Sequence, residues 1–271
     1  MNYSLNNKVV VITGGSSGIG FSLAKIFAAS NAKLYLLARD QNKLKYAASN
    51  LRDTYGNDLF VKTFTVDIGI DKEELSKVIN HIGTENDGID ILVNNAGILR
   101  CGRFDELSIM DFEESFQSNY MGALYTTKAA WKFLALKKGN VSFVSSVAGY
   151  IGLIGYSTYS PTKFAMTALA ECLRMEGKRE GITITIIYPG DTQTPLLEYE
   201  QKHALAETLA INKGIAVKEP DEVADKLIAG ILSGKFEVYC DNSSKFYRKL
   251  KGIFPKIFYR SIDSIAAKAS K

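Results

Sequence analysis

The segment YSPTKFA places Tyr159 four residues before Lys163, so that a phenol and an amine share one face of a helix. A free tyrosine titrates at about 10, which is too high for easy proton exchange at neutral pH. A nearby ammonium favours the phenolate, so the pair could serve as an acid/base catalyst. The alternative is a solvated pair on an amphipathic helix, and the spacing taken alone favours that alternative.

A glycine-rich segment follows the first apolar run of the chain. In VVVITGGSSGIG, Gly14, Gly18 and Gly20 come directly after the run at 9–13 and open a helix-length segment. Glycines permit a tight turn and let backbone N–H groups approach a pyrophosphate at a helix N-terminus. This context favours a dinucleotide site over a purely structural turn.

The end of the second apolar run bears on the choice of dinucleotide. Many such sites carry an acid here that binds the ribose 2′-hydroxyl, whereas this chain has Ala38 followed by Arg39. A planar guanidinium suits a 2′-phosphate, which favours NADP(H) over NAD(H), and Ser16 is placed to add a hydroxyl. Asp40 argues against this choice, and Arg39 as an ordinary surface residue is the alternative.

Seven apolar runs, separated by helix-length segments, are expected to position these residues. Strand, helix and strand at this spacing require right-handed crossovers and a parallel sheet. The expected fold is therefore α/β, a Rossmann-type doubly wound domain with a seven-stranded, mainly parallel sheet and helices on both faces. The runs span 9–13, 34–38, 60–66, 89–93, 141–146, 182–188 and 236–240.

We expect a single NADP-binding catalytic domain over residues 1–240 and a basic aromatic tail over 241–271. Residues 190–220 form the least regular internal segment, which predicts a substrate loop; a helix that packs its leucines on the body is equally consistent. The tail has eight Lys/Arg and two Asp/Glu. Basic residues among aromatics fit contact with an anionic membrane surface, and docking on the body or on a second subunit is the alternative.

Composition excludes several classes of protein. Hydrophobic residues at 46% and charged residues at 23% exclude intrinsic disorder. The three cysteines and two histidines have no partners at metal-ligand spacing, so no metal site is expected. Outside the tail the chain is slightly acidic, which disfavours a nucleic-acid partner. No export signal or spanning segment is recognisable, which predicts a cytoplasmic protein whose tail is the candidate for peripheral membrane contact.

The motifs together resemble the short-chain dehydrogenase/reductase family. They occur in the family's order between residue 8 and about residue 240, and the ordered set is far more specific than any one motif. The matching segments are TGGSSGIG at 13–20, Asp67 after the third run, NNAG at 94–97, Asn119 in SNYMGA, Ser146 in FVSS, YSPTK at 159–163 and YPGDTQT at 188–194.

The resemblance implies a role for each matching position. In the implied reaction, Tyr159 donates a proton to a carbonyl oxygen that Ser146 also binds, Lys163 holds the nicotinamide ribose, and Asn119 holds a water. These four residues form the implied catalytic set. The implied cofactor contacts, with Arg39 added, are Thr13, Gly14, Ser16, Ser17, Gly18, Ile19, Gly20, Asp67, Ile68, Asn94, Ala96, Gly97, Tyr159, Lys163, Pro189, Gly190, Thr192 and Thr194.

A narrower resemblance concerns the substrate. Residues 149–178 and the stretch from 188 are similar to the 3-ketodihydrosphingosine reductases, which reduce the ketone of 3-ketosphinganine with NADPH, although Gly190 stands where they have proline. Another ketone substrate, such as a steroid, a 3-oxoacyl thioester or a small carbonyl, is the alternative. A catalytically silent NADP-binding sensor is disfavoured, because all four catalytic side chains are present. Family resemblance also implies a homodimer or homotetramer.

Overall fold

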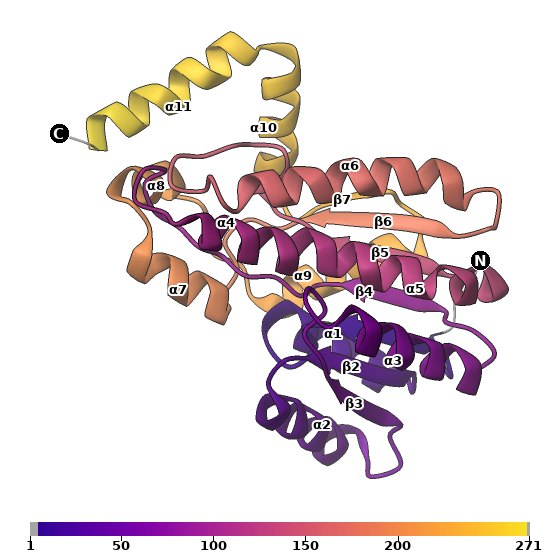
Figure 1. Ribbon diagram of the computed structural model, residues 1–271. Coiled ribbons are helices and arrows are strands. Elements are labelled where there is room, and N and C mark those ends of the chain that lie inside the picture. Colours follow the sequence, from indigo (N-terminus) through magenta and orange to yellow (C-terminus); the bar gives the residue numbers. More distant parts are fainter. Residues whose placement is uncertain (1–4, 270–271) are drawn as a thin grey trace.

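Seven parallel strands form one sheet in the order β3-β2-β1-β4-β5-β6-β7 in the computed structural model, which describes residues 5–269 (Figure 1). The expected doubly wound sheet is confirmed, and every neighbouring pair of these strands is parallel. The strands are β1 (Val9–Thr13), β2 (Lys33–Ala38), β3 (Val61–Thr65), β4 (Ile91–Asn94), β5 (Asn140–Val144), β6 (Thr183–Tyr188) and β7 (Glu237–Tyr239).

Helices cover both faces of the sheet because its strands are apolar on both sides. In β1, Val10 and Ile12 pack with residues of α1 (Gly18–Ala29), α2 (Gln41–Tyr55) and α9 (Pro220–Leu232). The alternate residues Val9 and Val11 pack with the opposite layer. That layer consists of α3 (Lys72–Glu85), α5 (Gly122–Lys137) and α6 (Ser160–Gly177).

The strand order reverses between β1 and β4, and this switch point is where doubly wound sheets bind ligands. Because all the strands run the same way, their carboxyl ends meet at one edge of the sheet. The glycine-rich turn after β1, residues 95–97 after β4, Ser146 after β5 and Pro189 after β6 therefore converge there.

The segment 190–220 is more regular than the sequence indicated. It contains two short helices, α7 (Pro195–His203) and α8 (Ala206–Asn212). Thr194 caps α7 by accepting from the backbone N–H of Leu197, and Pro195 occupies the first turn. Leu197 of α7 is buried, whereas Leu209 of α8 is 41% exposed. The substrate loop over 190–220 stays a prediction.

The C-terminal residues form two further helices that dock on the body, α10 (Asn242–Ile253) and α11 (Pro255–Ala269). The hydroxyl of Tyr150 donates to the carbonyl of Ser244 at 2.8 Å, and Lys251 Nζ donates to the carbonyl of Tyr150 at 2.6 Å. Arg248 pairs with Glu237 on β7 at 2.5 Å. In Figure 1, α11 extends over α8. Within residues 5–269, no helix combines the length and apolar character needed to cross a bilayer.

Candidate active site

The start of α6 positions the tyrosine and lysine of the YSPTK segment. Tyr159 immediately precedes the helix, and Pro161 lies in its first turn, where a missing N–H leaves no helical hydrogen bond unmade. Both functional side chains are almost fully buried, with 7% of Tyr159 and 3% of Lys163 exposed. Lys163 Nζ lies 5.6 Å from the centre of the Tyr159 ring and donates to the carbonyl of Val144 at 2.9 Å. The pair therefore shares one interior site, and it is not a solvated surface pair.

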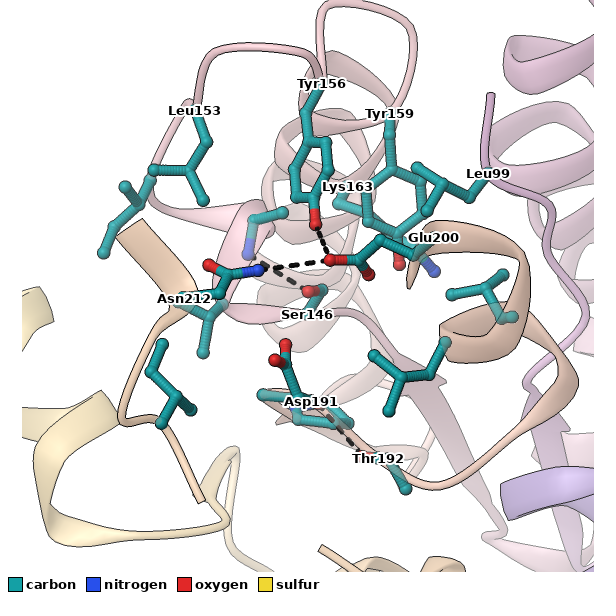
Figure 2. A pocket seen from close by; sticks show the side chains of 18 of the residues that line it. Leu99, Ser146, Leu153, Tyr156, Tyr159, Lys163, Asp191, Thr192, Glu200 and Asn212 are labelled. Atoms are coloured by element: carbon teal, nitrogen blue, oxygen red, sulfur yellow. Dashed lines mark hydrogen bonds between the residues drawn. The ribbon is translucent and has the colours of Figure 1, made fainter. Parts of the chain in front are cut away.

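Ser146 brings a second hydroxyl to the same site from the end of β5. Its backbone is extended, and its Oγ accepts from the N–H of Ala148 at 3.1 Å, which caps the short helical turn Val147–Gly149. The Ser146 side chain is also close enough to the Tyr159 hydroxyl to lower the pKa of that group. Figure 2 shows Ser146, Tyr159 and Lys163 grouped in the pocket.

Burial sets the protonation states of this group. It raises the pKa of Tyr159; the hydrogen bond with Ser146 lowers that pKa, and the negative charge of Glu200 raises it. Burial lowers the pKa of Lys163 to about 8. The expected lowering of the tyrosine pKa by Lys163 is therefore not found in the protein alone, where desolvation is the largest influence on that pKa. A protonated phenol is the state that a proton donor requires.

Asn119 supports the site from a single π-helical turn, Gln117–Met121, which joins α4 (Ile109–Phe116) to α5. Its Oδ1 accepts from the N–H of Ile98 at 2.7 Å. Its Nδ2 donates to the carbonyl of Ile98 and to Thr162 Oγ1, both at 3.0 Å. The fully buried amide thus ties the loop after β4 to the first turn of α6, and we assign it a positioning role.

The glycine-rich turn has the geometry that a phosphate-binding loop needs. Gly14 and Gly18 adopt positive φ angles of 66° and 53°, a conformation that favours glycine. A Cβ atom at Gly20 would lie 2.3 Å from the carbonyl oxygen of Gly14, so a larger residue would displace the backbone. Thr13 Oγ1 accepts from the N–H groups of Asn95 and Ala96 at 3.0 and 3.2 Å, which fixes the turn to the loop after β4.

The two asparagines of NNAG have different surroundings. Asn94, which the family resemblance places at the cofactor, donates to Thr127 Oγ1 at 2.9 Å inside the core and does not line the cavity. Asn95 lines the cavity and donates to the carbonyls of Thr13 and Gly14, both at 3.1 Å. The alternation of side chains along β4 was the available signal, because neighbouring residues at a strand end face opposite ways.

One cavity of about 840 Å³ runs from the glycine-rich turn past Tyr159 to the C-terminal helices. Thirteen of the sequence-predicted residues line it: Gly14, Ser17, Gly18, Ile19, Ala96, Gly97, Ser146, Tyr159, Lys163, Pro189, Gly190, Thr192 and Thr194. The others lie outside the lining: Thr13, Ser16, Gly20, Arg39, Asp67, Ile68, Asn94 and Asn119.

Arg39 lies beyond the cavity, at the end of β2, with its side chain 61% exposed. Its Nη1 is 3.7 Å from Asp67 Oδ2, a weak contact at this exposure. The carboxylate of Asp40 accepts from the backbone N–H groups of Asn42 and Lys43 at 2.9 and 3.0 Å and so caps α2. Asp40 is thus committed to its helix, which leaves Arg39 as the residue at this strand end that is available to an anion.

Sequence reasoning missed a polar group on the other side of Tyr159. Tyr156 packs edge-on against Tyr159 with ring centres 5.8 Å apart, and its hydroxyl donates to Glu200 Oε1 at 2.5 Å. Asn212 Nδ2 donates to the same oxygen at 3.1 Å. Asp191 also lines this part of the cavity (Figure 2). No motif marked Glu200, because its place depends on how α7 and α8 fold back over the site.

The chain shares this arrangement with known proteins. Residues 8–204 match the family described as short chain dehydrogenase. The 3-dehydrosphinganine reductase of Danio rerio is 38% identical over 86% of this chain and 70% of its own length. The 3-ketodihydrosphingosine reductase of Dictyostelium discoideum is 32% identical over 98% and 84%. The crystal structure of levodione reductase superposes with a TM-score of 0.80 at 26% identity, covering 89% of this chain and 98% of that one. The chain therefore belongs to the short-chain dehydrogenase/reductase family of oxidoreductases.

Proposed function

We propose that this protein is an NADPH-dependent reductase that converts 3-ketosphinganine to sphinganine, a step of sphingolipid synthesis. The observation that carries the proposal is the group of Ser146, Tyr159 and Lys163, which lines a cavity that extends to apolar residues of the C-terminal helices. The names of the relatives from Danio rerio and Dictyostelium discoideum support the substrate.

Each residue of the site has a separate role in the proposed ketone reduction. NADPH, when bound, supplies the hydride. The Tyr159 hydroxyl donates its proton to the oxygen of the carbonyl as negative charge develops there. Ser146 donates a hydrogen bond to the same oxygen and fixes its position. The ammonium of Lys163 stabilises the phenolate that remains and binds the ribose of the cofactor, while Asn119 keeps the start of α6 in place.

The switch point offers a binding surface for the dinucleotide. The pyrophosphate would lie against the turn of Gly14, Ser17 and Gly18 at the N-terminus of α1, where backbone N–H groups favour an anion. Thr194 approaches this turn from the β6 side, since its Cγ2 would lie 3.0 Å from a Cβ atom at Gly18. Arg39 at the end of β2 would bind the 2′-phosphate, with Asp67 near the adenine.

The far part of the cavity supports a long-chain substrate. Its lining also includes apolar residues from three regions of the chain, the turn after β5, α8 with its following loop, and the C-terminal helices, interspersed with polar ones. A cavity of this size can hold a lipid chain as well as the reacting carbonyl. The apolar lining residues are Ile151, Leu153, Ala210, Ile211, Ile215, Leu250, Phe258, Ile262 and Ile265.

The C-terminal helices also present an apolar face to solvent, which supports contact with a membrane surface. Ile253, Phe254 and Ile257 are 66, 53 and 62% exposed, respectively. Lys256 and Arg260 are exposed on the same helix pair. Such a surface fits the interface of an anionic bilayer, from which the lipid substrate would enter the cavity.

The proposed function is tested by NADPH oxidation with 3-ketosphinganine beside short ketones, a steroid ketone and 3-oxoacyl thioesters, with NADH as the alternative cofactor. We expect the highest kcat/KM with 3-ketosphinganine and NADPH. Tyr159→Phe should lower kcat by about 10²- to 10⁴-fold with NADPH affinity retained, because only the proton donor is removed. Activity confined to short ketones would refute the lipid substrate, and a fully active Tyr159→Phe enzyme would refute the assigned acid.

A further inference from the structure

Of the acidic side chains that line the cavity, Asp241 caps α10, whereas two others have no role in the hydride and proton transfer proposed above. Glu200 projects from α7 and Asp191 follows β6, and both point into the pocket near Ser146 (Figure 2). Glu200 is only 7% exposed. Acidic residues are seldom buried so deeply without a cation, because desolvation of the charge is costly.

Neither carboxylate has a cationic partner within residues 5–269. Burial raises the pKa of Asp191, and burial together with the charge of Asp191 raises that of Glu200. The hydrogen bonds that Tyr156 and Asn212 donate act in the opposite direction and lower the pKa of Glu200.

The cationic side chains that line the cavity contact other groups or are exposed. Lys163 donates to the carbonyl of Val144, and Lys218 Nζ lies 3.9 Å from Glu222 Oε2. Arg100 Nη2 lies 3.2 Å from Glu114 Oε2, and Lys213 is exposed. Only one oxygen of Glu200 is engaged, since both of its hydrogen bonds end on Oε1. The carboxylate therefore leaves Oε2 for a cation that enters the cavity.

We propose that Glu200, assisted by Asp191, binds the ammonium group of a 2-amino ketone and thereby selects sphingoid bases among long-chain ketones. The inference rests on the proposed function and identifies the ammonium as the part of the substrate that Glu200 and Asp191 recognise. In 3-ketosphinganine the amine is on C2, directly beside the C3 ketone. A group that binds the amine must therefore lie next to the group that binds the ketone oxygen.

The contacts of Tyr156 provide this adjacency. Its ring packs edge-on against Tyr159, which donates the proton, and its hydroxyl holds Glu200. The charge of Glu200 is near enough to raise the pKa of Tyr159. An amine beside a carbonyl titrates near the α-amino value of about 8, so it is largely protonated at neutral pH.

The same carboxylates disfavour competing ketones. A steroid ketone or a 3-oxoacyl thioester has no cation next to the reacting carbonyl, so its binding would leave both carboxylates desolvated and unpaired. Discrimination of this kind comes from the penalty on the wrong ligand as much as from attraction to the right one.

Three ketones of equal chain length separate the charge from the lipid chain: 3-ketosphinganine, its N-acetyl derivative and 1-hydroxyoctadecan-3-one. With the full-length enzyme we expect kcat/KM for the free amine to exceed that for either uncharged ketone by about 30-fold or more. Glu200→Gln keeps the shape of the side chain and should reduce this preference at least about tenfold. Glu198→Gln makes the same change at an exposed position of α7 and should leave the preference intact.

The outcomes distinguish this inference from the proposed function. Equal use of all three ketones by the unaltered enzyme would overturn ammonium recognition and leave the reductase assignment standing. Failure to reduce any of them would overturn the proposed function itself. If Glu200→Gln lowered kcat/KM equally for all three ketones, Glu200 would merely hold Tyr156, and the inference would be wrong.

NADPH binding, measured by fluorescence, verifies that the Glu200→Gln variant is folded. Asp191→Asn should also reduce the preference for the free amine.

Discussion

The proposed catalytic residues show which properties of a side chain can be predicted from its neighbours in the sequence. The identity of Ser146, Tyr159 and Lys163 followed from the family motifs, and the structure brings all three together. Their protonation states could not be predicted from these motifs, because a four-residue spacing does not show how deeply the side chains are buried. In the folded chain desolvation is the largest influence on the pKa of both Tyr159 and Lys163. It raises the pKa of the phenol and lowers that of the amine to about 8.

Burial of the Lys163 ammonium lowers the stability of the folded protein, and its proposed role in catalysis explains why it is retained. Lys163→Met should raise the free energy of unfolding at pH 7 by about 2–3 kcal/mol, because it removes a charge that burial disfavours. The folded pKa of about 8 is below the ordinary value of 10.5, so the unfolded chain binds more protons between these two values. The stability of the unaltered protein therefore rises with pH across this interval relative to the variant.

Urea denaturation between pH 7 and pH 11 measures this difference. We expect the gap between the two proteins to be widest below pH 8 and to narrow as the pH approaches 10.5. Lys128→Met is the matched control, since Lys128 is exposed on α5 and its removal should leave the pH profile unchanged. A variant less stable than the parent at every pH would mean that the hydrogen bond to Val144 outweighs desolvation.

Among the elements, the strands and their turns were predictable, whereas the covering helices were not. Buried parallel strands are continuous apolar runs, and the glycines after β1 mark a turn that other residues cannot adopt. The Thr194–Pro195 pair is a helix-start signal that was available for α7. The direction in which Glu200 points was not available, because it depends on contacts with Tyr156 and Asn212, which are distant in the sequence.

The turn between β1 and α1 gives a prediction at the scale of the element. Gly20→Ala should destabilise the protein by about 1–3 kcal/mol and weaken NADPH binding, because its Cβ atom would press on the carbonyl of Gly14 and move the turn. Gly252→Ala is a suitable control, since a Cβ atom there meets nothing within 4 Å and alanine favours the helix. Thermal unfolding and a fluorescence titration with NADPH provide the two measurements. An NADPH affinity equal to that of the parent would contradict the role given to the turn.

At the scale of the whole molecule, the tail is part of the enzyme as well as a candidate membrane contact. The charge and the aromatic residues of the tail could be read from the sequence, but the contacts that dock it on the body could not. Tyr150 is distant from the tail in the sequence, and Glu237 belongs to a separate element, β7. The division at residue 240 stays a prediction, as does the homodimer or homotetramer implied by the family. Light scattering in solution would determine the number of subunits.

The exposed face of the tail makes a separate prediction. The double substitution Phe254→Ser and Ile257→Ser should reduce pelleting with anionic liposomes several-fold at low salt, because it removes apolar area that would enter the interface. Ketone reduction in detergent should change little, since neither side chain lines the cavity. Leu136→Ser alters an equally exposed residue on α5 and serves as the control. If the unaltered protein and the double variant both pelleted negligibly, the membrane contact would be dismissed.

Tyr150 links the turn that follows Ser146 to the C-terminal helix α10. It closes the turn that begins at Ser146, its hydroxyl holds the backbone of α10, and its carbonyl receives Lys251. Displacement of α10 would therefore disturb, through Tyr150, the same short turn that begins at Ser146. Substitutions that loosen α10 are thus expected to shift Ser146 as well as the part of the cavity lining that the C-terminal helices contribute.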